Sequence, residues 1–288
     1  MPVEAIQQIR AMKGNTRPHL MLGDDSHFYV VKFHSAIQST RQLVSEMLGT
    51  ELARWVGLPT PESDVVNVCQ FLIDGTPDLA NGVKLGLGYE AGLQFGSRML
   101  GGQNGEQAWD YIPRSHFHNV DNLSTVAGMF AFDRWTSNLS IRQGVFYQRS
   151  SKSKRRLYFI DNGSCFSGPE WAYQDSSFGG LFRYRDVYRD IAGWESFEPY
   201  LTRMITIAPT KLEEVYRMIP CSWCQDDHHQ LVQLLEKLLL RRSRIHELIA
   251  KSREVHPELF SGWKQKIFVP ASFDTCMASR SLQDETAR

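Results

Sequence analysis

The chain has 288 residues, of which 42% are hydrophobic and 22% charged, the balance of a folded globular protein with a sizeable core. Its 32 basic and 32 acidic side chains give a formal net charge of zero, which argues against specific nucleic-acid binding and against attachment to a membrane surface. No apolar run reaches the roughly 18 residues of a membrane span. Five scattered cysteines are typical of a reduced, cytoplasmic protein.

The first stretch of the chain, to about residue 100, is predicted to form strands around one helix. Apolar and β-branched residues at 27–33 predict a strand. Residues 39–59 predict the helix, because apolar side chains recur there at helical spacing and because Gly57 and Pro59 can end it. Further strands are predicted at 65–73 and 92–100.

The remainder of the chain is mixed at first and then helical. The stretch from about 101 to 205 has a predicted helix at 121–135 and predicted short strands at 144–148 and 157–161. Leucine and isoleucine then recur on one face of residues 226–254, which predicts one long amphipathic helix packed on a core. The pattern fades after that, and we predict a partly disordered tail.

A lysine in the strand at 27–33 has a candidate partner on the following helix. Lys32 lies in Val-Val-Lys-Phe, where an ammonium among apolar residues is costly unless it finds a counter-charge. Glu46 lies on the next helix, beside residues that face its buried side. An ion pair would neutralise both groups and leave the ammonium facing a phosphate. The alternative is a lysine that reaches water at a strand edge and an unrelated, exposed glutamate.

Transfer of a phosphoryl group from ATP needs a cation on the phosphates, a carboxylate that orients this cation, a second carboxylate for Mg²⁺ and a covering loop. Gly14, Asn15 and Thr16 form a predicted turn whose backbone N–H groups could cover phosphates or merely close a hairpin. An apolar strand runs into Asp161, which Asn-Gly follows. A carboxylate placed this way suits a Mg²⁺ ligand, and an ordinary turn is the alternative.

Together these segments resemble the HipA-like kinase family, specifically its short, single-domain forms. The matching segments are YVVKF (29–33), LVSEMLGTELARWVGLPTP (43–61), GLQFGSR (92–98), FDRWTSN (132–138), FIDNGSCF (159–166) and GWESFEP (193–199). Their order and spacing are far more specific than any one of them. We therefore expect an α+β, two-lobed protein-kinase-like fold. Its expected parts are a β-rich N-lobe at 1–100, a mainly helical C-lobe at 101–253 and a tail at 254–288.

The resemblance also implies roles for single residues. Lys32 corresponds to the ATP-binding lysine, Glu46 to its helix partner and Asp161 to the Mg²⁺-binding aspartate. The strand at 92–98 would lead into the hinge between the lobes, which places the adenine near Gln94–Arg98, with Gln94 and Phe95 as expected contacts. ATP and Mg²⁺ are therefore the expected cofactors, and a protein serine or threonine is the expected acceptor. The sequence does not name the protein substrate or a regulatory partner.

The loop at 132–146 departs from the family pattern. The family has an aspartate as catalytic base where this chain has Ser140, and a metal-binding asparagine where it has Val145. General-base assistance is typically worth about 10²–10⁴-fold, whereas positioning and electrostatics carry most of phosphoryl transfer. A weakened kinase with Asn138 or Gln143 near the metal is one reading. A catalytically inactive, nucleotide-binding pseudokinase that regulates a partner is the other.

Two side chains and one segment leave further alternatives open. Asp133 could act as a base through a water molecule, or it could cap its helix or pair with Arg134. The segment at 167–190 would line the acceptor site. Its aromatic and arginine side chains do not decide between a protein acceptor and a small molecule, since kinase-like lobes serve both.

Cysteines and histidines near residue 225 raise the question of a zinc site. Cys221 and Cys224, with His228 and His229, could supply four ligands. The two histidines open a predicted helix, where adjacent side chains diverge by about 100°. We therefore favour ordinary thiols.

Overall fold

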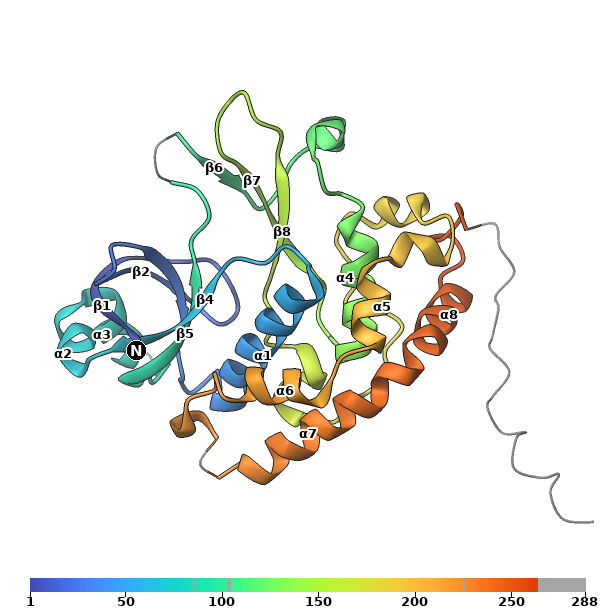
Figure 1. Cartoon of the computed structure of the whole chain (residues 1–288). Coiled ribbons are helices and arrows are strands. Elements are labelled where there is room, and N and C mark those ends of the chain that lie inside the picture. Colours follow the sequence, from blue (N-terminus) through green and yellow to red (C-terminus); the bar gives the residue numbers. More distant parts are fainter. Residues whose placement is uncertain (85, 103–104, 225, 264–288) are drawn as a thin grey trace, which may run out of the picture.

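The computed structural model describes residues 1–84, 86–102, 105–224 and 226–263. Figure 1 shows a strand-rich part and a helical part, joined by the connection that follows β5. The strands are β1 (Val3–Ala11), β2 (His19–Gly23), β3 (Phe28–Lys32), β4 (Ser63–Val68), β5 (Gly92–Arg98), β6 (Gln107–Trp109), β7 (Gln143–Gln148) and β8 (Arg156–Ile160). The α-helices are α1 (Thr40–Val56), α2 (Gln70–Gly75), α3 (Pro77–Lys84), α4 (Thr125–Thr136), α5 (Tyr200–Ile205), α6 (Pro209–Tyr216), α7 (His228–Arg241) and α8 (Ile245–Val255).

The strand-rich N-terminal part is a closed barrel with the strand order β1-β2-β3-β5-β4. Neighbouring strands are antiparallel, except that β1 and β4 pair in parallel and close the barrel. Side chains alternate along β3, and Tyr29 and Val31 lie in the core inside the barrel. Lys32 therefore points to the outer face, opposite Phe95 of β5 in the register.

Helix α1 is buried on two sides, because it lies between the barrel and the C-terminal helices (Figure 1). Its apolar residues, such as Leu43, Met47 and Leu52, belong to a core cluster that extends through the C-terminal part. The helix ends at Gly57, whose φ of 94° is a left-handed conformation that glycine adopts without steric cost. Burial on two sides also encloses polar residues of α1, among them Glu46.

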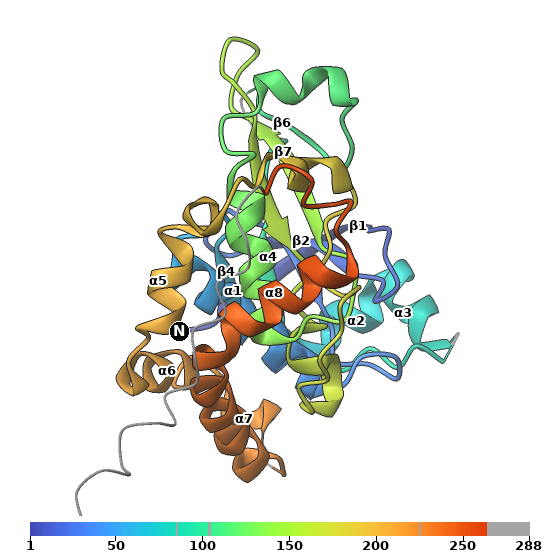
Figure 2. The ribbon, with the colours of Figure 1, turned by 90° about the vertical axis from the view of Figure 1, so that its right-hand side faces the viewer.

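The C-terminal part is mainly helical and surrounds α4, every residue of which is buried. Figure 2 shows α8 lying across α4, and the two helices are in contact. The indole Nε1 of Trp135 on α4 donates a 3.0 Å hydrogen bond to the carbonyl oxygen of Leu238 on α7. Strands β6, β7 and β8 form an antiparallel sheet. The strand-rich and helical parts confirm the expected α+β architecture.

Two elements differ from their sequence-based expectation. The predicted strand at 65–73 ends at Val68, and α2 follows it, with Ile73 buried in the barrel core. An apolar run of this length cannot be divided between strand and helix by periodicity alone. The predicted helix at 226–254 is two helices, because the backbone tightens into a 3₁₀ turn at Arg242–Arg244.

The chain remains packed beyond residue 253, where the C-lobe was expected to end. Leu259, Phe260 and Trp263 are buried, and Nη2 of Arg253 donates a 3.0 Å hydrogen bond to the carbonyl oxygen of Trp263. The rest of the predicted tail, 264–288, lies outside the described residues. Within the part that the structure describes, no helix has the length and apolar character needed to cross a membrane.

Gly128 on α4 permits close contact with α5. A Cβ at this position would lie 2.1 Å from Cδ2 of Tyr200. We expect Gly128→Ala to lower the free energy of unfolding by about 1–3 kcal/mol, because overpacking outweighs the roughly 0.5–1 kcal/mol that alanine contributes in a helix. Urea denaturation measures this value. The control is Gly75→Ala on α2, where nothing lies within 4 Å and no loss is expected. Equal losses in both variants would contradict the packing argument.

Candidate functional site

Lys32, Glu46 and Asp161 meet where the barrel, α1 and the end of β8 converge. Nζ of Lys32 donates a hydrogen bond to Oε1 of Glu46 and another, of 2.6 Å, to Oδ1 of Asp161. Lys32 and Glu46 are buried, whereas the side chain of Asp161 is 29% exposed. The structure thus brings together three residues that are far apart in the sequence, and one edge of their cluster faces solvent.

The turn after β8 is docked on α1 by Glu46. Oε2 of Glu46 accepts a 2.9 Å hydrogen bond from the backbone N of Asn162, and the Asn162 side chain donates one of 3.0 Å to Oγ1 of Thr50. The approach is close because Gly49 has no side chain, and a Cβ there would lie 2.7 Å from Cβ of Asn162. The position of Asp161 is therefore tied to the position of α1.

The charges of the cluster act on one another. Burial alone would lower the pKa of Lys32, but attraction to Glu46 and Asp161 outweighs it and raises that pKa above its usual range. Burial also opposes ionisation of Asp161, but Lys32 holds the pKa of this carboxyl below its ordinary value. Burial raises the pKa of Glu46, against the attraction of Lys32. Because two carboxylates surround one ammonium, the cluster can accommodate another cation.

Asp161 follows directly on β8 and has a left-handed backbone, with φ of 67°. Its Oδ2 accepts a 2.5 Å hydrogen bond from Nε2 of Gln143. Gln143 is exposed and opens β7, opposite Ile160 in the register. The structure thus places Gln143, a predicted metal neighbour, directly beside the predicted metal carboxylate.

The predicted phosphate-covering turn at 14–16 lies at the same end of the barrel as Lys32. His19, at the start of β2, pairs with Val31, the residue before Lys32. The turn itself joins β1 to β2, and its three residues are exposed or half-buried. The turn therefore lies beyond the end of β3 that carries Lys32.

Gln94 and Phe95, which were expected near the adenine, are buried. Oε1 of Gln94 accepts a hydrogen bond from the backbone N of His34, and its Nε2 donates one to the carbonyl oxygen of Glu90, each of 2.7 Å. Phe95 belongs to the core that α1 shares with the C-terminal part. Phe95 pairs with Lys32 in the register and so lies on the same face of the sheet, and the contact of these two residues with a base stays a prediction.

A cavity of about 430 Å³ lies at the opposite end of the sheet, where the chain leaves the barrel. Its lining includes Phe28 at the start of β3, Met99 and Leu100 after β5, and Tyr147 and Tyr158 on β7 and β8. The two tyrosine rings meet edge to face, with centroids 5.9 Å apart. Charged side chains such as Glu62, Arg98 and Glu106 also line the cavity, whose volume lies in the range of small-molecule sites.

A family model described as HipA-like kinase matches residues 3–252 of the chain. The chain belongs to the HipA-like kinase family. Together with the strand-rich and helical parts described above, this membership confirms the expected kinase-like fold. A search of curated proteins gives no match.

Solved structures of other kinases are similar at low sequence identity. The Golgi casein kinase matches at 11% identity and a TM-score of 0.48, over 90% of this chain and 76% of that one. Its structure with Mn/ADP bound matches at 11% and 0.48, over 88% and 74%. The Helicobacter pylori proinflammatory kinase CtkA matches at 12% and 0.45, over 85% and 95%.

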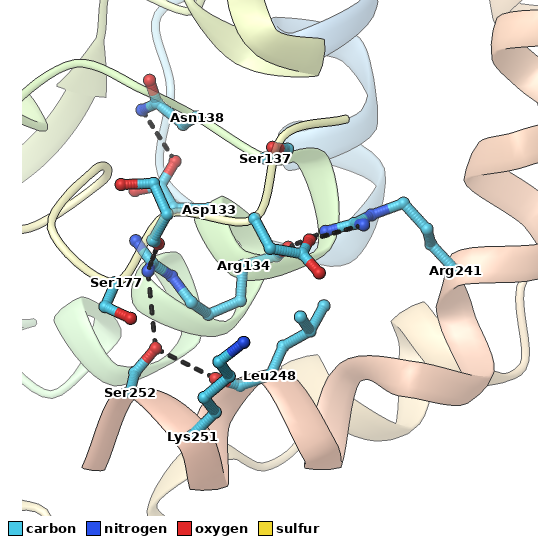
Figure 3. Close-up of a pocket in the computed structure, with 11 residues that line it drawn as sticks. Asp133, Arg134, Ser137, Asn138, Ser177, Arg241, Leu248, Lys251 and Ser252 are labelled. Carbon is cyan, nitrogen blue, oxygen red and sulfur yellow. Dashed lines mark hydrogen bonds and ion pairs between the residues drawn. The ribbon is translucent and has the colours of Figure 1, made fainter. Parts of the chain in front are cut away.

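The polar side chains of the loop around Ser140 form hydrogen bonds with one another. Oδ1 of Asn138 accepts hydrogen bonds from the backbone N of Ser140 at 3.0 Å and from its Oγ at 3.1 Å. Nδ2 of Asn138 donates one of 2.9 Å to Oδ1 of Asp133, as Figure 3 shows. Asn138 is buried and both of its amide atoms are engaged. Its role as a metal ligand stays a prediction, and it would require one of these hydrogen bonds to open.

Asp133 is fully buried against Arg142, a residue that the sequence did not single out. Nε of Arg142 donates a 3.0 Å hydrogen bond to Oδ2 of Asp133, and Nη2 donates one to Oδ1. The side chains are 1% and 0% exposed. Asp133 is thus enclosed in an ion pair with Arg142 rather than with Arg134.

The CxxC segment lies just before α7. Cys221 is exposed and Cys224 buried, and both are free. Nδ1 of His228 lies 2.7 Å from the hydroxyl of Tyr216, within hydrogen-bond distance. Across the residues that the structure describes, no three or more histidine, cysteine, aspartate or glutamate side chains gather as a metal site.

Proposed function

We propose that this HipA-like kinase transfers the γ-phosphoryl group of ATP, with Mg²⁺, to a serine or threonine of a protein in the cytoplasm. The observation that carries the proposal is the cluster of Lys32, Glu46 and Asp161, which faces solvent at one edge. A cation oriented by one carboxylate, beside a second carboxylate for the metal, is what phosphoryl transfer requires. The free thiols of the described cysteines suit a reducing compartment.

The nucleotide would lie along β3, with its phosphates at Lys32 and its adenine beside Phe28. Four residues of strand separate these positions, about 13 Å at roughly 3.3 Å per residue, which suits an extended nucleoside triphosphate. The cavity beside Phe28 offers the rings of Tyr147 and Tyr158 to the base. The turn at 14–16 would supply backbone N–H groups at the phosphate end.

The residues around Asp161 fit Mg²⁺. This ion takes oxygen ligands, keeps several waters and is usually held by one or two carboxylates together with substrate phosphates. Oδ2 of Asp161 and, after rotation of its amide, Oε1 of Gln143 would be the ligands from the protein. When bound, the metal would neutralise charge on the phosphates. Lys32 would hold the phosphates in place, and Glu46 would keep Lys32 oriented.

The acceptor would approach the loop that carries Ser140. The backbone N of Gly180 donates a 2.6 Å hydrogen bond to the carbonyl oxygen of Ser140, so the segment at 167–190 borders this loop. A serine hydroxyl cannot take up a proton as a carboxylate does, and Asp133 is enclosed by Arg142. We therefore propose a slow kinase, which lacks about 10²–10⁴-fold of base assistance.

A pseudokinase that binds nucleotide and regulates a partner is the second candidate. It is favoured by the hydroxyl of Ser140, which is bonded inward to Asn138. It is also favoured by Val145, an apolar residue of β7 at the position where the family places a metal-binding asparagine.

One assay distinguishes the two candidates: transfer of label from ATP in the presence of Mg²⁺ is measured for the wild type, Ser140→Asp and Asp161→Ala. We expect slow transfer by wild type, none by Asp161→Ala, and transfer faster by about 10²-fold or more in Ser140→Asp, because a carboxylate is returned to the base position. Transfer in Ser140→Asp alone would favour the pseudokinase. Failure of the wild type to bind ATP in calorimetry would contradict both candidates.

A further inference from the structure

The turn that carries Asp161 is bonded to a fully buried arginine. Nη1 of Arg142 donates hydrogen bonds to the carbonyl oxygens of Ile160 and Asp161, at 2.9 and 3.3 Å, and to Oδ1 of Asn162 at 3.0 Å. Its other two nitrogens bind Asp133 on α4. One guanidinium thus joins the central helix of the C-terminal part to three consecutive residues around the metal candidate.

Asp161 needs such support because its backbone is left-handed, with φ of 67°. A residue with a Cβ rarely adopts this conformation, which persists where the surrounding structure fixes it. On its other side the turn is held by α1, through the 2.9 Å hydrogen bond from the backbone N of Asn162 to Glu46. Arg142 and Glu46 therefore form hydrogen bonds with the same turn from two different parts of the molecule.

We propose that Arg142 is a positioning residue, which fixes this turn so that the carboxylate of Asp161 faces Lys32, the metal and the nucleotide phosphates. The inference rests on the proposed nucleotide- and metal-binding function. Asp133 completes the arrangement, because its carboxylate compensates the charge of Arg142 inside the protein. Arg142 is fully buried and acts on the metal only through Asp161.

Only an arginine has enough N–H donors, in the right geometry, to bind both Asp133 and the turn at 160–162. A guanidinium presents five N–H groups in a fixed plane, whereas a lysine carries three donors on a single nitrogen. A lysine cannot bind the Asp133 carboxylate at two points and still reach the turn at 160–162. Arg142→Lys therefore keeps the charge and removes the positioning.

Arg241 provides a matched control. It is also buried, and it donates hydrogen bonds of 2.9 Å to the carbonyl oxygens of Trp135 and Arg134 and one of 2.8 Å to Asp175. Figure 3 shows its guanidinium reaching toward the end of α4 from α7. Arg241→Lys thus disturbs a similar network that does not include the turn at 160–162.

The first test is the affinity for ADP, measured by calorimetry with and without Mg²⁺. Residues that orient metal ligands typically affect metal affinity by roughly 10–100-fold. We expect Arg142→Lys to lose that much of the Mg²⁺-dependent affinity while its affinity for metal-free ADP is unchanged. Arg241→Lys should keep both. A wild type that does not bind ADP at all contradicts the proposed function, and a full Mg²⁺ effect in Arg142→Lys contradicts the positioning role.

The second test needs no nucleotide. The amide of Asn162 is protected by Glu46 only while the turn is held, and its hydrogen exchange reports local opening. We expect loss of this protection in Arg142→Lys and wild-type protection in Arg241→Lys. Unchanged exchange in Arg142→Lys, or equal loss in both variants, overturns the inference whether or not the protein binds ADP.

Discussion

Replacing Lys32 with methionine is expected to abolish nucleotide binding and to lower the free energy of unfolding by roughly 3–5 kcal/mol. The loss of stability arises because Glu46 and Asp161, which both bind Nζ of Lys32, would be left as neighbouring carboxylates without their cation. Glu46 is 2% exposed and has little access to water. The loss of binding arises because Lys32 is the proposed phosphate cation. Urea denaturation and calorimetry with ADP measure the two effects.

A second substitution separates stability from binding. In Lys32→Met/Glu46→Gln the buried carboxylate is neutral, so most of the lost stability should return while nucleotide binding stays absent. The matched control is Lys211→Met, which breaks the exposed pair with Glu214. An exposed pair is worth about 0–1 kcal/mol, so little change is expected. Recovery of ADP binding in the double variant would contradict the role of Lys32.

Sequence patterns predicted the elements around the site because apolar residues recur in them at strand or helix spacing. The apolar faces of the strand that ends at Lys32 and of the helix that carries Glu46 can be recognised in the sequence. A charged residue within such a face needs a partner. Asp161 could be placed because an apolar strand runs into it. Lys32 and Glu46 pair as the burial of their charges predicted, and Asp161 joins them as the resemblance implied.

Arg142 could not be predicted in the same way. It lies between Ile141, which is 61% exposed, and Gln143, which is also exposed, so its surroundings in the sequence are those of a surface loop. Its burial depends on Asp133 in α4 and on the turn after β8, which are brought to it only by tertiary packing. The same holds for Asn138, whose amide is taken up by local hydrogen bonds that no spacing rule reveals.

The expected adenine position shows a related limit. A resemblance can place a strand such as β5 without deciding which of its residues face a ligand. Gln94 is bonded to His34 and Glu90 inside the N-terminal part. The cavity opens where β5 ends and the chain leaves the barrel, beside Arg98 and Met99, at the end of the range in which the adenine was expected.

Asp161→Asn is expected to abolish the effect of Mg²⁺ on nucleotide affinity and to lower phosphoryl transfer by about 10²–10³-fold or more. Asparagine has almost the same shape, so the change removes the charge that the metal requires and leaves the packing. Affinity for metal-free ADP should be unchanged or higher, because Lys32 then has one carboxylate partner, Glu46, instead of two. Calorimetry with and without Mg²⁺ measures both affinities, and Gln143→Leu is the companion variant that removes only the neighbouring amide.

The pH dependence of the same measurement sharpens the prediction. Lys32 and Arg142 hold the pKa of Asp161 below its ordinary value, against the effect of burial, so the carboxylate stays ionised above about pH 4. Asp161 should therefore not limit the wild-type Mg²⁺ effect between pH 5 and pH 7, and a decline in that range is expected only from protonation of the terminal phosphate of ADP, whose pKa is about 6. Asp161→Asn should show no Mg²⁺ effect at either pH. If this variant keeps a full Mg²⁺ effect, the metal binds elsewhere, and the arrangement of one ammonium between two carboxylates would then serve the fold rather than phosphoryl transfer.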